Sequence, residues 1–313
     1  MVILDFERPI FELETKIKEL KNLNTGDLSI NQEIKKLEEK LNKLLQQVYK
    51  NLSPWQIVQV ARHITRPQTA DYIRSMFSDF VPLCGDRAFG NDEAIIAGIA
   101  KFRGHSVAVL GHQKGKDTDD RIKHNFGMPH PEGYRKASRI MRLASKFNIP
   151  LITFIDTAGA YPGVGAEQRG QAEAIGMCLE ESMKVKSPII SLVIGEGGSG
   201  GAVALAVANK IYMMEYSTYS VISPEGCASI LWRDPTKAQD AADALKLTAN
   251  YLLKFKLIDG IVKEPLGGAH RDPELAIKNA ADTISSALNE LMASNQDFAT
   301  SRREKFFNFG RQM

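Results

Sequence analysis

Two short apolar segments, each of which runs directly into a glycine-rich segment, constrain this chain more than any other feature. Leu151–Ile155 is followed by the glycine-rich residues 156–170, and Pro188–Ile194 is followed by GEGGSGGA at 195–202. A helix-forming pattern comes after each of them. Continuous apolar runs of this length are typical of strands that helices bury on both faces. The sequence therefore predicts an α/β fold with helices packed on a sheet.

The remaining elements are expected to continue this alternation of strands and helices. We expect strands over 94–100 and 106–110, which would form a hairpin, and short strands over 211–214 and 219–222. We expect helices over 132–147, 166–184, 201–208, 224–232, 236–245, 248–255 and 273–294. The length of 313 residues fits two domains or one large α/β domain.

The N-terminal region has a different pattern, with apolar residues at spacings of three and four. They form two series on either side of a break at 24–27: Ile10, Leu13, Ile17 and Leu20, then Ile34, Leu37, Leu41, Leu44, Val48 and Leu52. This pattern predicts a hairpin of two amphipathic helices. The apolar stripes either pack on the chain's own domain or contact another subunit. We divide the chain into an N-terminal helical region, 1–55, expected to contact a subunit, and a domain over 56–313 that ends in helices.

Charge and cysteine content exclude several classes of protein. The 40 Lys and Arg residues against 37 Asp and Glu residues give a net charge of +3, too small to make nucleic acid the main partner. Cys84, Cys178 and Cys227 form no CxxC pair, which argues against a zinc site made by this chain and against a disulfide framework. No apolar stretch approaches the roughly 20 residues that span a bilayer. We expect a soluble cytoplasmic protein.

The segment at 195–202 matches several motifs at once. Gly195, Gly197 and Gly200 fit the dinucleotide fingerprint G-x-G-x-x-G, with Glu215 as a possible ribose ligand. The spacing also fits a P-loop, but Gly201 stands where that loop needs a lysine, which excludes it. The dinucleotide interpretation stays open.

A second open interpretation is a serine hydrolase. Ser199 is the central residue of a G-x-S-x-G motif, and Asp259 and His270 could complete a triad in the order Ser, Asp, His.

Five glycines within residues 195–201 can also serve through their backbone. Without side chains, successive N–H groups at a helix N-terminus can point toward one ligand and stabilise an oxyanion. The loop at 156–170 would lie beside this one if the two strands are neighbours. A single pyrophosphate needs only one such loop, so the pair favours an acyl-transfer or enolate site.

Long stretches of this sequence resemble a known family. They are DTAGAYPGVGAEQRGQ at 156–171, VIGEGGSGGA at 193–202 and YSTYSVISPEGCASILW at 216–232, supported by GHQKG at 111–115, NFGMPHPEGYRKA at 125–137 and EPLGGAHRDP at 264–273. Together they resemble the α subunits of bacterial acetyl-CoA carboxylase carboxyltransferase. The resemblance covers nearly the whole chain.

This resemblance implies an α/β fold, a crotonase-like (ClpP-like) spiral of ββα units with an N-terminal helical hairpin. It implies transfer of a carboxyl group from carboxybiotin, on a biotin carboxyl carrier protein, to acetyl-CoA, which gives malonyl-CoA for fatty-acid synthesis. It also implies a β subunit that carries a zinc ribbon and much of the CoA site, a separate biotin carboxylase, and an α2β2 assembly. No cofactor is expected to be attached to this chain, and no metal is expected in it.

By the same resemblance, the backbone N–H groups of Gly200 and Gly201 stabilise the oxyanion of biotin, and the β subunit supplies the hole for the enolate. Gly159, Gly163, Gly197 and Gly198 are expected to line the substrate site. We expect Gly201 to lack a side chain because biotin must approach there.

The histidines and the basic residues carry weaker signals. The six histidines show no metal-ligand spacing, and His270, which follows two glycines, is the best candidate for a functional one. Seven basic residues in 112–139 predict a solvated face or a surface that attracts CoA phosphates or an acidic carrier: Lys114, Lys116, Arg121, Lys123, Arg135, Lys136 and Arg139.

Overall fold

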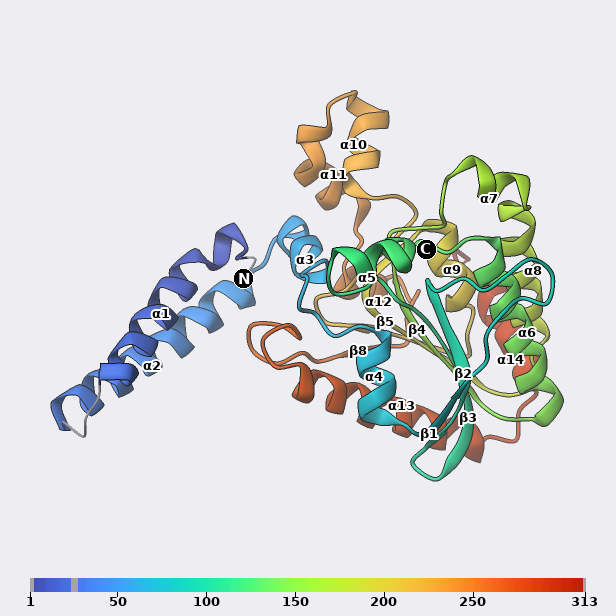
Figure 1. Ribbon diagram of the computed structural model, residues 1–313, viewed down its shortest axis with the longest axis horizontal. Coiled ribbons are helices and arrows are strands. Elements are labelled where there is room, and N and C mark those ends of the chain that lie inside the picture. Colours follow the sequence, from blue (N-terminus) through green and yellow to red (C-terminus); the bar gives the residue numbers. More distant parts are fainter. Residues whose placement is uncertain (1–2, 24–27, 312–313) are drawn as a thin grey trace.

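A single sheet of eight strands lies at the centre of the molecule (Figure 1). The computed structural model describes residues 3–23 and 28–311. The strands lie in the order β1-β2-β3-β4-β5-β6-β8, and β7 pairs with the end of β5. They are β1 (Ser78–Pro82), β2 (Ile95–Phe102), β3 (His105–His112), β4 (Leu151–Thr157), β5 (Ile189–Gly198), β6 (Lys210–Met214), β7 (Thr218–Ser220) and β8 (Gly260–Val262).

The sheet changes direction once. β1, β2 and β3 are antiparallel neighbours, whereas the pairs from β3 to β8 are parallel. Parallel strands place their carboxyl ends at one edge of the sheet, so the residues that follow β4 and β5 meet there.

Helices cover both faces of the sheet, whereas α10 and α11 project away from it (Figure 1). The helices that follow the N-terminal region are α3 (Pro54–Ala61), α4 (Thr69–Met76), α5 (Thr118–Lys123), α6 (Pro131–Phe147), α7 (Val164–Gln168), α8 (Gln171–Lys184), α9 (Ser199–Ala206), α10 (Pro224–Trp232), α11 (Ala238–Leu245), α12 (Ala249–Lys254), α13 (Pro273–Ala293) and α14 (Phe298–Phe307). No described helix is long and apolar enough to cross a membrane.

Alternate residues of each central strand enter two different cores. Leu151 and Ile155 of β4 pack against α6, α8 and α9, whereas Ile152 and Phe154 pack against α4 and α13. All seven residues of β4 are buried. Burial on both faces explains why the sequence shows a continuous apolar run here instead of an alternating one.

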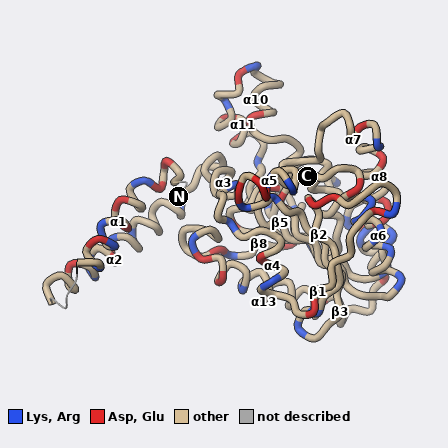
Figure 2. Tube along the Cα trace, viewed as in Figure 1, with Lys and Arg blue, Asp and Glu red and all other residues tan. Residues whose placement is uncertain are grey.

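The predicted N-terminal hairpin is present as α1 (Arg8–Leu23) and α2 (Leu28–Lys50), which extend away from the sheet (Figure 1). Lys and Arg alternate with Asp and Glu along both helices (Figure 2), as expected for solvated faces. At its base, Ile10 and Tyr49 pack with Val60 of α3. The predicted break at 24–27 lies outside the described residues.

Several expected elements differ from the structure in their bounds, and two of the differences affect the glycine-rich segments. β5 continues through Gly198, because Glu196, Gly197 and Gly198 pair with β7, so half of the expected glycine loop is strand. The single helix expected over 166–184 is two helices, since Gly170 adopts a left-handed φ of 79° between α7 and α8. Only glycine takes that conformation at little cost.

Candidate functional site

The two glycine-rich segments lie side by side at the carboxyl edge of the sheet. Thr157 at the end of β4 is in register with Gly197 of β5. A Cβ atom at Gly198 would stand 2.2 Å from the carbonyl oxygen of Ala158, so the two backbones touch. Thr157 holds the turn, since its hydroxyl accepts from the N–H of Gly159 at 3.0 Å and donates to the carbonyl of Gly159 at 2.8 Å. The expected juxtaposition of the two loops is confirmed.

The helix α9 begins directly where β5 ends. Gly200 and Gly201 are its second and third residues, so their N–H groups belong to the first turn, which has no acceptor within the helix. Gly200 is half-buried, and the nearest atom to a Cβ built there is a methyl group of Ile175 at 3.7 Å. The first turn of α9 therefore holds backbone donors without acceptors in the helix, which suits an anion or a developing oxyanion.

Gly201 lacks a side chain for a different reason from the expected one. A Cβ there would stand 2.7 Å from both the carbonyl carbon of Gly159 and the nitrogen of Ala160, and 3.0 Å from the hydroxyl of Tyr134. The missing side chain lets α9 approach the other loop, and it does not open a path for a ligand. The expectation that the substrate approaches through this position is wrong.

Two further expected site glycines occupy separate positions. Gly197 is buried against β7, since a Cβ would stand 2.9 Å from the ring of Tyr219. Gly163 precedes α7, and the atoms nearest to its missing side chain belong to the ring of Tyr161, at 2.3 Å. Gly163 therefore lies further along its loop than Gly159.

Ser199 stands at a sharp turn from strand to helix and is exposed, with a left-handed φ of 51°. That backbone resembles a nucleophile elbow. A triad also needs a base and an acid close to the serine. Asp259 instead accepts a hydrogen bond from the N–H of Ile211 at 2.7 Å, and Ile211 is in register with Ser191, roughly 25 Å before Ser199 along β5. The triad is not assembled.

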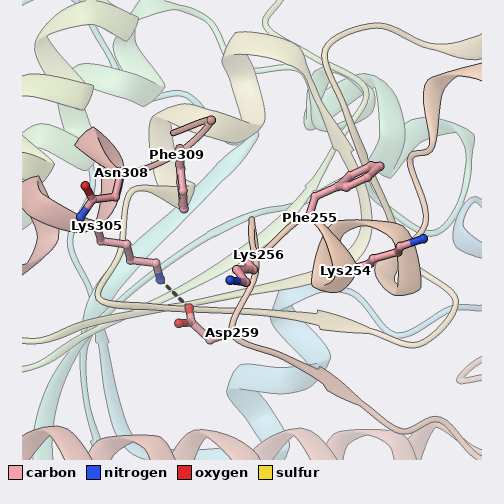
Figure 3. A pocket seen from close by; sticks show the side chains of 8 residues that line it. Lys254, Phe255, Lys256, Asp259, Lys305, Asn308 and Phe309 are labelled. Atoms are coloured by element: carbon pink, nitrogen blue, oxygen red, sulfur yellow. Dashed lines mark hydrogen bonds and ion pairs between the residues drawn. The ribbon is translucent and has the colours of Figure 1, made fainter. Parts of the chain in front are cut away.

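Asp259 lies at the opposite edge of the sheet, in a cavity of about 520 Å³ (Figure 3). Its carboxylate is ion-paired with Lys305 of α14, as Figure 3 shows. Lys254, Phe255 and Phe309 also line this cavity.

The acid proposed for a dinucleotide ribose is also engaged elsewhere. Glu215 accepts a hydrogen bond from Lys263 at 2.6 Å and another from the N–H of Glu264 at 3.1 Å. Both of its oxygens are therefore satisfied within the chain.

A network of charged side chains lies directly under the glycine loops. Asp156 Oδ1 accepts from the N–H of Glu196 at 2.9 Å and lies 2.7 Å from Lys114 Nζ. Arg62 joins Glu196 to Glu225 of α10, with a contact of 2.6 Å to each. Burial alone would raise the pKa of Glu196, but Lys114 and Arg62 together hold it below its usual range. The network fixes the end of β5 and keeps the Glu196 carboxylate ionised.

Sequence reasoning missed most of this network. Glu196 stands inside the glycine run and could have been noticed as the one charged residue there. Arg62 carried no signal, because it lies 134 positions away from its partner.

The expected basic face is wrong for three of its seven members. Lys114 is part of the network just described, and Arg135 pairs with Asp86 at 2.7 Å. Lys136 is buried and donates to the carbonyl of Asp92 at 2.6 Å. Lys116 and Lys123 are exposed, as expected. The spacing could not reveal this, because the partners Asp156, Asp86 and Asp92 come from other segments and meet these basic residues only on folding.

Comparison with known proteins places these features in a family. The family model described as "Acetyl co-enzyme A carboxylase carboxyltransferase-like" matches residues 3–310. The acetyl-coenzyme A carboxylase carboxyl transferase subunit alpha of Xanthobacter autotrophicus is 57% identical over 313 residues, and that of Chelativorans sp. is 54% identical over 312; both alignments cover 99% of each chain.

Solved structures share the fold at low sequence identity. A transcarboxylase 12S structure with hydrolysed methylmalonyl-coenzyme A bound superposes with a TM-score of 0.62 and 19% identity, over 78% of this chain and 45% of that one. A Pseudomonas malonate decarboxylase hetero-tetramer in complex with coenzyme A gives 0.57 and 14%, over 70% and 89%. The α/β, crotonase-like fold with N-terminal helices is confirmed.

Proposed function

Because the chain belongs to the carboxyltransferase α subunits of acetyl-CoA carboxylase, we propose that its paired glycine loops receive carboxybiotin from a carrier protein and stabilise the charge that its decarboxylation creates. The chain is thus a transferase subunit that serves fatty-acid synthesis. The observation that carries the proposal is the first turn of α9, where the N–H groups of Gly200 and Gly201 have no acceptor within the helix and lie beside the 156–170 loop.

Decarboxylation of carboxybiotin needs hydrogen-bond donors at the ureido oxygen. Carboxybiotin supplies the carboxyl group as CO2, and its ureido oxygen gains negative charge as the N–C bond breaks. The N–H groups of Gly200 and Gly201 donate to that oxygen, each contributing roughly 3–4 kcal/mol where such donors have been measured. Gly159, Gly197 and Gly198 hold the loop backbones at the spacing this requires, and Gly163 shapes the outer part of the same loop. The proton leaves the methyl group of acetyl-CoA for the biotin nitrogen, and the resulting enolate carbon takes up CO2 to give malonyl-CoA.

The second half of the site comes from a zinc-ribbon β subunit in this proposal. Four exposed apolar side chains on and beside α10 support the presence of a protein partner there. They are Val221, Ile230, Leu231 and Trp232, with 75%, 72%, 65% and 39% of their surfaces exposed. Large exposed apolar groups of this kind mark interaction sites. Arg62 links this region to the glycine loops through Glu225 and Glu196.

The two chains form a cytoplasmic α2β2 complex, served by a biotin carboxyl carrier protein and an ATP-dependent biotin carboxylase. Residues 1–55 contact another subunit, and residues 56–313 form the carboxyltransferase domain. Zinc belongs to the β subunit in this scheme.

The test is the reverse reaction, in which malonyl-CoA carboxylates free biotin. We expect the purified chain to be nearly inactive alone and to gain robust activity when its β subunit is added. Robust activity of the isolated chain would contradict the shared site. Stoichiometric labelling of Ser199 by a fluorophosphonate would favour the hydrolase instead.

A further inference from the structure

Three residues that are far apart in the sequence converge where the N-terminal hairpin joins the sheet. Glu7 precedes α1, His63 follows α3, and His270 lies in the loop after β8. One potential ligand atom from each lies within 4.8 Å of those of the other two. The sequence pointed to His270 alone, because metal-ligand spacings are recognised only between residues close in the chain.

The buried side chain of His270 lacks a hydrogen-bond partner among the described residues. Its side chain is only 5% exposed, and neither ring nitrogen has a hydrogen-bond partner among the described residues. Nε2 lies 3.5 Å from Glu7 Oε1, within ion-pair distance but without hydrogen-bond geometry. Burying an imidazole with both nitrogens unpaired is costly, and structures rarely retain such a group without a water or an ion beside it.

We propose that Glu7, His63 and His270 form a binding site for a divalent transition-metal ion of the zinc class. Two histidines and one glutamate are a common protein ligand set for zinc, with water as the fourth ligand. A cavity of about 240 Å³ lined by these residues leaves room for that water.

The geometry is within side-chain adjustment of coordination. The rings of His63 and His270 have centroids 4.1 Å apart. Two imidazoles bound tetrahedrally to one zinc ion at about 2.1 Å place their centroids roughly 5.3 Å apart, so the two stacked rings must rotate and separate by about 1 Å. His63 would bind through Nε2, because its Nδ1 contacts Thr65. Glu7 is fixed beside them by Tyr49, whose hydroxyl donates to Oε1 at 2.6 Å. Among the described residues, the contacts of Tyr49, Arg271 and His270 all go to Oε1, so Oε2 is the oxygen available as a ligand.

The surrounding charge is compatible with a cation. Glu7 and Glu14 both line the cavity or its edge, and Arg271 is ion-paired with each of them. The two carboxylates and one guanidinium leave one negative charge, which a divalent ion more than neutralises. A bound ion would tie the start of the hairpin to two segments of the main body.

The experiment uses the full chain, without an affinity tag and without any β subunit, after exhaustive treatment with EDTA. Zn²⁺ or Co²⁺ is added and the bound metal is counted by mass spectrometry after gel filtration. We expect one equivalent per chain, a rise in melting temperature of several degrees at saturating Zn²⁺, and a Co²⁺ spectrum with visible d–d bands. Thiolate charge-transfer bands should be absent, since the cluster contains no cysteine.

Variants at the cluster separate this site from nonspecific binding. Glu7→Gln, His63→Gln and His270→Gln should each weaken binding about a hundredfold or more and abolish the thermal shift. His105→Gln, at an exposed position in β3, is the matched control and should bind like the parent. Substoichiometric metal in the parent, or metal that the three variants retain, would overturn the proposal; the orphaned imidazole would then be satisfied by water.

Discussion

Arg62 donates two hydrogen bonds to a single oxygen of Glu196, at 2.8 Å from Nε and 2.6 Å from Nη2. This contact joins the end of α3 to the segment that carries the candidate oxyanion donors. It is largely buried, with 29% of the Arg62 side chain and 12% of the Glu196 side chain exposed.

We predict that Arg62→Met destabilises the chain by about 2–4 kcal/mol, because it leaves a mostly buried carboxylate with only Lys114 as a counterion. Urea denaturation measures this free energy. Arg62→Met combined with Glu196→Gln should lose less than the two single changes added together. The exposed pair Lys184–Glu180 is the control, and Lys184→Met should be nearly neutral. Equal losses of unfolding free energy at the two sites would show that burial of the Arg62–Glu196 pair contributes nothing to stability.

A second buried cation holds the C-terminal helix. Arg302 of α14 is fully buried and donates to the carbonyls of Ser182, Val185 and Ser187 and to Asn209 Oδ1, at 2.7–3.0 Å. Burial lowers its pKa to about 10, so it stays charged at neutral pH.

We predict that Arg302→Met costs about 3 kcal/mol, because four acceptors lose their donors and most stay buried. Its exposed neighbour offers a matched control, and Arg303→Met should be nearly neutral. Thermal denaturation of the two variants in parallel gives the comparison. If Arg303→Met were the more destabilising change, the stabilising role assigned to the Arg302 hydrogen bonds would be wrong.

The sequence predicted the sheet better than the site. Leu151–Ile155 and Pro188–Ile194 identified β4 and β5, because burial on both faces leaves an apolar run that is visible without any tertiary information. The pairing of the glycine loops was expected only if these strands were neighbours, a condition that the pairing of β4 with β5 fulfils. The family resemblance supplied the oxyanion role of Gly200 and Gly201.

Long-range contacts account for what the sequence could not predict. Arg62 and Glu196 become partners only through folding, and so do Glu7, His63 and His270. Gly201 must be a glycine because the backbone of Gly159 lies against it in the folded chain. No local sequence pattern encodes that contact. Lys136 looked like a surface lysine, because its position on the inner face of α6 depends on how that helix packs.

A third prediction concerns stability against pH. His112 is fully buried, and burial lowers its pKa from the usual 6.5 to about 3. Between these values the unfolded chain binds a proton that the folded chain does not, so stability falls as pH falls below 6.5. Between pH 7 and pH 5.5 this residue alone should cost about 1 kcal/mol.

The measurement is the free energy of unfolding at several pH values for the parent and for His112→Gln. The variant, which has no proton to gain at this position, should show a shallower decline toward acid pH, whatever its stability at pH 7. Parallel declines in the two proteins would mean that His112 does not titrate between folded and unfolded states.

The last prediction concerns the donors themselves. Gly201→Ala places a Cβ 2.7 Å from the backbone of the neighbouring loop, so α9 must move and both N–H groups lose their alignment. We predict that turnover of the complex with the β subunit falls about a hundredfold, the equivalent of roughly 3 kcal/mol for one donor. Gly200→Ala meets no atom closer than 3.7 Å and keeps its N–H group, so the chain should fold normally and lose far less activity.

Ser199→Ala completes this series, because it removes the hydroxyl and leaves every backbone donor in place. Its turnover should stay within about threefold of the parent, since an exposed side chain that serves no nucleophilic role contributes little. The three variants must be compared at equal assembly with the β subunit, measured by gel filtration, so that a loss of partner binding is not read as a loss of catalysis. If Ser199→Ala abolished carboxyl transfer while Gly201→Ala retained it, the chemistry would depend on the hydroxyl, and the strand-to-helix turn at φ 51° would be a nucleophile elbow after all.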